Sequence, residues 1–223
     1  MKSEKFFFTF NLVIRAVLVI AIIATIFEQN WLFVFLGSLA LLLTFFPKIV
    51  ERRYKIELPI SLQIIIVLFI YAGVFLGGVR NFYERFWWWD SMLHFISGIG
   101  LGFAGFLFLY VLYKKGKIER NPGLIAFLSF CFALSLGALW EIFEFSIDSF
   151  FGYNMQRARD LCSPDEICDT RLGVIDTMID LILNTIGALI ASAAGYLYLK
   201  TGGIPVFRGF VEKFEKKNPN LFK

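Results

Sequence analysis

His94 is the single histidine of this 223-residue chain, and it lies four positions after Asp90. Four residues are close to one helical turn, so on a helix the two side chains share a face. A spacing of three residues separates Glu141 from Glu144, which places those carboxylates on one face as well. An imidazole combined with carboxylates can bind a divalent metal ion or exchange protons with a substrate.

A third polar group follows closer to the C-terminus. Asp176, Asp180 and Asn184 recur every four residues and also share one helical face. We predict that the three groups converge on one polar site. The predicted metal ligands are Asp90, His94, Glu141 and Asp180, the predicted general bases are Glu144 and Asp176, and the predicted substrate contacts are Asn184, Asp148 and Arg157.

Several buried carboxylates in one site need a compensating charge or proton. A divalent cation is one solution, and oxygen ligands with one imidazole suit Zn, Mn, Mg or Ca, depending on the geometry. Shared protons are another solution. Pairing with arginines is a third, and the candidates are Arg80, Arg85, Arg157, Arg159 and Arg171. In a purely structural alternative, the polar side chains only hydrogen-bond the helices to one another.

The elements that carry these residues have a membrane protein's composition. Hydrophobic residues make up 58% of the chain and charged residues 18%, against roughly 45–50% and 25% in soluble domains. Six apolar runs approach the length of about 20 residues that spans a bilayer, at 6–27, 31–46, 59–78, 88–113, 122–150 and 174–199. We therefore predict an all-α, polytopic membrane bundle of six transmembrane helices over residues 1–199. A soluble cytosolic enzyme is excluded.

Lysine and arginine concentrate in every second loop between the predicted helices. This pattern predicts how the protein is oriented in the membrane, because basic loops stay on the cytoplasmic side. Both termini are then cytoplasmic in the plasma membrane, and the polar site in residues 87–195 and the loop 151–173 face outwards. The net charge of +4 reflects this topology and does not indicate a nucleic-acid partner. Residues 200–223 are predicted to be an amphipathic cytoplasmic tail that lies on membrane lipid through Phe207, Phe210, Val211 and Phe214.

Three cysteines divide between two environments. Cys162 and Cys168 fall in the outer loop, where the sequence is compatible with a disulfide or with free thiols. Cys131 lies inside a predicted helix and is expected to be a small apolar filler.

The last three predicted helices resemble the VanZ-like superfamily of bacterial and archaeal membrane proteins, and in particular its uncharacterised YjdF-type branch (DUF2238). The resemblance rests on three runs within residues 87–195, namely WDSMLHF, WEIFE and DTMIDLILNTIGA. Where VanZ-type members commonly have glutamine, this chain has Glu144, whose added negative charge favours a metal or proton role. The family's D-x-x-x-H pair corresponds to Asp90 and His94, its acidic pair to Glu141 and Glu144, and its D-x-x-x-N-x-x-G run to Asp180, Asn184 and Gly187.

Three hypotheses for the function follow. The first is a metal-assisted hydrolase or transferase that acts at the outer leaflet on a lipid-linked or phosphorylated envelope substrate. The second is a proton- or cation-coupled transporter or channel. The third is a non-catalytic envelope factor of the VanZ-like type. VanZ-like proteins are associated with resistance to the glycopeptide teicoplanin, so the resemblance implies a site but no particular reaction.

Overall fold

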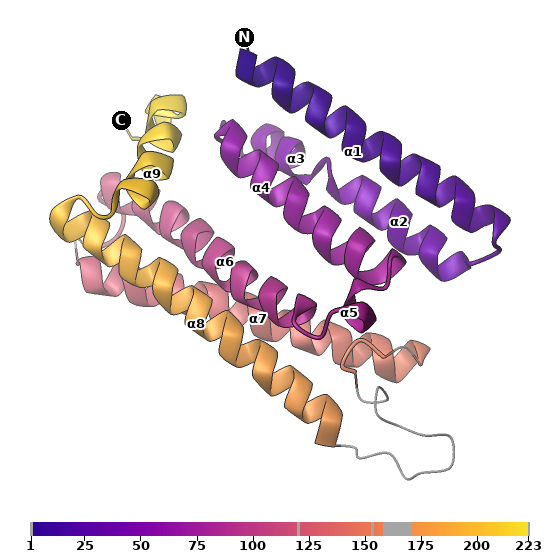
Figure 1. Cartoon of the computed structure of the whole chain (residues 1–223). Coiled ribbons are helices and arrows are strands. Elements are labelled where there is room, and N and C mark those ends of the chain that lie inside the picture. Colours follow the sequence, from indigo (N-terminus) through magenta and orange to yellow (C-terminus); the bar gives the residue numbers. More distant parts are fainter. Residues whose placement is uncertain (1, 120, 153, 158–170, 223) are drawn as a thin grey trace. The chain divides into compact units, whose positions relative to one another are not determined.

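The computed structural model describes residues 2–119, 121–152, 154–157 and 171–222, and these residues form helices without a strand (Figure 1). Five helical segments are long and apolar enough to cross a membrane, and a bent helix pair makes a sixth if it counts as one span. The predicted all-α, polytopic membrane architecture is confirmed. The five spans are Lys5–Phe27, Ile60–Val79, Trp89–Lys114, Pro122–Phe151 and Arg171–Thr201.

The chain divides into two compact units, which are described separately. The first comprises Met1–Asp90 and Gly209–Lys223, and the second comprises Ser91–Arg208. The first unit contains α1 (Lys2–Phe27), α2 (Trp31–Leu43), α3 (Phe46–Tyr54), α4 (Ile60–Ile70), the π-helix η1 (Tyr71–Val79) and α5 (Phe82–Arg85). The second contains α6 (Trp89–Lys114) from Ser91 onwards, α7 (Pro122–Phe151) and α8 (Arg171–Thr201). α9 (Pro205–Lys217) continues from the second unit into the first, and the short 3-10 helix η2 (Pro219–Leu221) follows it.

The predicted span 31–46 is the one that the structure divides. α2 ends at Leu43 after 13 residues, about 20 Å of helix, and the chain then bends by 41° into α3. Arg15 of α1 stabilises this break: its guanidinium donates to the side-chain oxygen of Thr44 at 3.0 Å and to the Thr44 carbonyl at 3.2 Å, and it lies over the Phe45 ring. A cation beside the C-terminal carbonyls of a helix is favourable.

A π-helix continues the predicted span 59–78. The Ala72 carbonyl of η1 accepts a hydrogen bond from the indole N–H of Trp89 at 3.3 Å. Trp89 is the first residue of α6. The start of the helix that carries Asp90 and His94 is thus anchored by a hydrogen bond to a backbone carbonyl.

The predicted amphipathic tail is a helix whose apolar side is buried. Phe207, Val211 and Phe214 of α9 are at most 8% exposed. Beyond the helix, Asn218 fixes the chain to the loop before α4: it accepts from the Glu57 amide at 2.7 Å and donates to the Glu57 carbonyl at 2.8 Å. The position of this tail on the cytoplasmic side stays a prediction.

Replacing Asn218 with alanine is expected to loosen the tail, because the Glu57 amide and carbonyl lose their partners. A loss of about 1–3 kcal/mol of local stability is expected, measured as faster backbone hydrogen exchange in residues 205–222. Asn220, which is exposed, offers the matched control, and Asn220→Ala is expected to exchange like the natural chain. Equal hydrogen exchange in both variants would contradict the role of Asn218 in holding the tail to the loop before α4.

Small residues bring α6 and α8 into backbone contact within the second unit. A methyl group added at Gly98 would collide with the Asn184 carbonyl, and one added at Gly187 would collide with the Phe95 carbonyl. At Gly102 it would lie 2.8 Å from the Ala191 side chain. The small-residue pattern therefore serves close helix packing, as is common in membranes.

Candidate metal centre

Asp90 and His94 occupy the first turns of α6 and are both buried, at 8% and 7% exposure. Asp90 is the last residue of the first unit, but the same helix carries both side chains, so their spacing follows from α6. A carboxylate in the first turn also interacts favourably with the helix dipole.

α7 contributes its two glutamates through a buried ridge. Its buried positions recur every four residues from Ile125 through Ser129, Ala133 and Gly137 to Glu141, and Glu144 extends the buried face. The bulky residues between them, such as Phe143 and Phe145, are exposed. The carboxylates of Glu141 and Glu144 therefore lie on the side of α7 that packs within the protein.

α8 supplies two of the most deeply buried polar residues near this cluster. Asp180 and Asn184 are 2% and 1% exposed and lie on the face of α8 that continues through Gly187 and Ala188. That face is in contact with α6 at Gly98, and α7 packs along the same helix: a methyl group at Gly137 would lie 2.6 Å from Asn184 Oδ1. The three helices thus meet around Asn184.

The three polar groups converge, as predicted from their helical spacing. One ligand atom of each of Asp90, His94 and Asp180 lies within 4.8 Å of the others. The same holds for His94, Glu141 and Glu144. His94 belongs to both sets, so one imidazole lies among four buried carboxylates.

In this cluster His94 Nδ1 lies 3.4 Å from Glu141 Oε1. A charge-assisted hydrogen bond would be about 2.7–2.9 Å long. Two ligands of one tetrahedral ion with bonds of about 2.1 Å lie roughly 3.4 Å apart. The spacing of these two atoms therefore matches shared coordination better than a direct hydrogen bond.

Hydrogen bonds from neighbouring side chains support the residues of the cluster. Asn184 Nδ2 donates to Ser97 Oγ at 3.1 Å, and Ser97 Oγ donates to the His94 carbonyl at 2.7 Å. Trp140 Nε1 donates to Glu144 Oε1 at 2.9 Å. Sequence reasoning missed Ser97 and Trp140, although each lies one helical turn from a predicted site residue.

Asn184 retains an unused acceptor. Its Oδ1 is buried and accepts no hydrogen bond from the residues that the structure describes. The space in front of Gly137 accommodates this amide, because an alanine there would approach Oδ1 to 2.6 Å. A buried acceptor of this kind is costly unless a ligand satisfies it.

Besides Asn184, three predicted site residues belong to neither ligand set. Asp148 accepts the backbone amides of Met155 at 2.7 Å and Gln156 at 2.9 Å, so its carboxylate holds the turn after α7. Asp176 is half-buried one turn before Asp180, and Arg157 is half-buried in that turn after α7. Their roles as base and substrate contacts stay predictions. Cys162, Cys168 and Arg159 lie outside the described residues.

The comparisons with known proteins agree with the membrane architecture. The profile of a family described as "Predicted membrane protein (DUF2238)" matches residues 10–201. A protein of Thermotoga maritima, described as uncharacterized, is 28% identical over 161 residues, which cover 71% of this chain and 73% of that protein. No solved structure matches the chain. Because the family profile covers most of the sequence, the chain belongs to the DUF2238 family of predicted membrane proteins.

Proposed function

We propose that this membrane protein binds a divalent metal ion between α6, α7 and α8 and uses it to hydrolyse or transfer a group on a lipid-linked or phosphorylated substrate. The observation that carries the proposal is the packing of one imidazole and four carboxylates into two overlapping ligand sets, each within 4.8 Å. Four carboxylates at such depth are costly to keep ionised without a cation. The imidazole favours Zn or Mn over Mg or Ca, which prefer oxygen ligands alone.

The described residues fit the ion in their chemistry and burial. Asp90, His94, Glu141 and Asp180 would hold it, and the buried Asn184 Oδ1 offers a further oxygen for the ion or for a substrate group. A bound divalent ion supplies Lewis acidity and lowers the pKa of water. Glu144, which accepts a hydrogen bond from Trp140, would accept a proton from water or from a substrate hydroxyl.

A catalytic role fits this polar distribution better than transport. A coupled transporter needs ionisable or polar groups along a path across the membrane. The buried acids of α6, α7 and α8 gather towards one end of these helices, whereas the buried polar side chains described towards the other end include the hydroxyls of Ser129 and Ser192. Ser129 donates to the Ile125 carbonyl of its own helix.

The site is proposed to face the exterior of the plasma membrane. Basic residues gather at the opposite ends of α6 and α8, as in Lys114 and Lys200, and the positive-inside rule assigns those ends to the cytoplasm. This orientation and the proposed VanZ-like relationship together favour an envelope lipid or a lipid-linked precursor as the substrate.

The experiment has two parts. The full chain, purified in detergent and incubated with Mn²⁺ or Zn²⁺, is expected to retain stoichiometric metal in elemental analysis. With lipid phosphates as substrates, Glu144→Gln is expected to retain the metal and lose turnover, because it removes only the proton acceptor. Metal-free protein under both conditions would refute the metal centre, and full turnover by Glu144→Gln would refute the role of this glutamate.

Replacing Trp140 with phenylalanine is expected to lower turnover by about 10–100-fold and to leave metal binding intact, because Glu144 loses the hydrogen bond that orients it as proton acceptor. The ring is retained, so its packing with Phe143 at 5.3 Å is preserved. Turnover of lipid phosphates by the metal-loaded protein would measure this loss, with Phe143→Leu as the control for packing. Unchanged turnover in Trp140→Phe would show that the indole N–H does not orient Glu144.

A further inference from the structure

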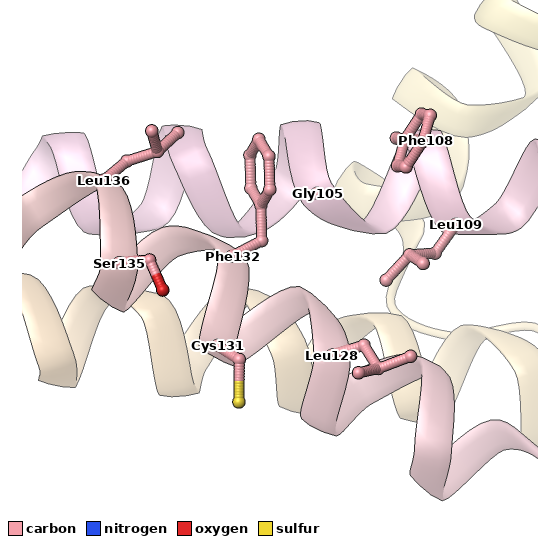
Figure 2. A pocket seen from close by; sticks show the side chains of 8 residues that line it. All are labelled: Gly105, Phe108, Leu109, Leu128, Cys131, Phe132, Ser135 and Leu136. Atoms are coloured by element: carbon pink, nitrogen blue, oxygen red, sulfur yellow. The ribbon is translucent and has the colours of Figure 1, made fainter.

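An open apolar groove of about 330 Å³ lies between α6 and α7. Gly105 and Phe108 line it from α6, and Leu128, Cys131, Phe132 and Leu136 line it from α7 (Figure 2). Figure 2 shows the Phe132 ring directed towards Gly105, where the absent side chain makes room for it. A glycine of α6 thus faces a phenylalanine of α7 in the lining of the groove.

The groove lies deeper in the membrane-spanning segments than the metal centre. Twelve residues separate Phe132 from Glu144 on α7 and eleven separate Gly105 from His94 on α6, about 16–18 Å along each helix axis. Half the hydrocarbon thickness of a bilayer is about 15 Å. A cluster near one membrane surface therefore places the groove near the middle of the bilayer, where hydrocarbon covers it.

A continuous ridge of α7 joins the groove to the cluster. The groove residues Leu128, Phe132 and Leu136 recur every four positions, and the next two positions of this ridge are Trp140 and Glu144. The neighbouring ridge from Ile125 to Glu141 is buried with the same repeat. The surface that leads away from the groove thus ends at the glutamate to which Trp140 donates.

The rim of the groove favours a flexible chain over a packed helix. Phe108 is 60% exposed, and Phe132 is still 40% exposed although its ring lies over Gly105. Helices in membranes approach one another closely through small residues, and two bulky, exposed rings prevent that approach. A hydrocarbon chain can bend between them.

We propose that the groove holds one acyl chain of a phospholipid whose phosphate headgroup lies at the metal centre. This inference rests on the proposed function and names its substrate class, a membrane phospholipid. The headgroup would sit beside His94 and Glu144, and the acyl chain would follow the ridge of Trp140 and Leu136 to Cys131.

Photocrosslinking of the full chain tests the proposal. The protein is reconstituted in phosphatidylcholine vesicles that contain phosphatidic acid with a diazirine near the end of one acyl chain, and the labelled residues are mapped by mass spectrometry. Labelling is expected at Phe108, Cys131 and Phe132. Cys131→Trp and Leu128→Trp, which fill the groove from different positions, are both expected to lose this labelling. Ile190→Trp, on the exposed side of α8, is expected to retain it.

A fourth variant tests whether headgroup and chain belong to one lipid. His94→Ala is expected to reduce groove labelling because the headgroup loses its site. Any of three results would overturn the proposal. Labelling could be unchanged in His94→Ala, it could be unchanged in both groove variants, or an isoprenyl phosphate analogue could label the groove more strongly. Metal content measured on the same wild-type sample distinguishes failure of the acyl-chain proposal from failure of the proposed function. Bound metal without groove labelling refutes only the acyl-chain site, whereas metal-free protein refutes the proposed function.

Discussion

Replacing His94 with alanine is expected to lower the affinity for Mn²⁺ or Zn²⁺ by about 100-fold or more, beyond the loss typical of a residue behind the ligands. His94 is the member that the two ligand sets share, so its removal affects both at once. It is also the single imidazole of the chain, and the remaining carboxylates form a harder site that suits Mg or Ca. Elemental analysis and titration calorimetry of the purified variant would measure this loss.

Ser192→Ala provides the control for this experiment. Ser192 is a buried polar residue of α8, 4% exposed, outside both ligand sets. The control is expected to retain natural metal content. Thermal unfolding of both variants without metal distinguishes loss of the site from loss of the fold. A folded His94→Ala protein with natural metal content would contradict the metal centre.

Gly98→Ala is expected to destabilise the protein by about 1–3 kcal/mol, the usual cost of overpacking. The added methyl group would meet the backbone of α8 at Asn184 and at Ala188, whose amide nitrogen lies 3.0 Å away. Backbone atoms cannot turn aside as a flexible side chain can. Because α8 carries Asp180 and Asn184, its displacement is also expected to weaken metal binding.

Gly100→Ala is the matched control on the same helix. Gly100 is exposed, and an added methyl group there meets nothing within 4 Å. Alanine favours a helix over glycine by about 1 kcal/mol, so this variant is expected to be as stable as the natural chain or more stable. Thermal unfolding in detergent compares the two, and equal midpoints would contradict a close α6–α8 contact.

The spans were predictable because a chain in lipid must satisfy its backbone hydrogen bonds within each helix, and long apolar runs therefore reveal the helices. The break within 31–46 was not predictable in this way. It is stabilised by Arg15, which lies 29 residues before Thr44, and a hydropathy pattern contains no information about such a pairing. The π-helical turns of η1 were missed for a similar reason, because local composition does not distinguish them from α-helix.

The convergence of the cluster followed from helical spacing and from the alternating direction of the spans. Its supporting contacts did not follow, because the partners of Ser97 and Trp140 depend on how the side chains pack. Asp148 shows that the depth of a residue in the membrane is hard to estimate from sequence. Because it lies seven residues after Glu141, it looks in the sequence like another intramembrane acid. It lies in the last turn of α7, where its carboxylate accepts two amides of the following turn.

The hydrogen-bonded link from Asn184 through Ser97 to the His94 carbonyl has a consequence for biogenesis. α6 and α7 are synthesised before α8, so they carry acids into the bilayer while Asp180 and Asn184 are still in the ribosome or the insertion machinery. An unaccompanied charged group costs at least about 2.5–3.5 kcal/mol at mid-membrane, and a smaller but still unfavourable amount at the depth of this cluster. The insertion of α8 therefore supplies the polar partners that α6 and α7 need to remain stably in the bilayer. In a nascent chain that stops before α8, the acids of α6 and α7 face lipid.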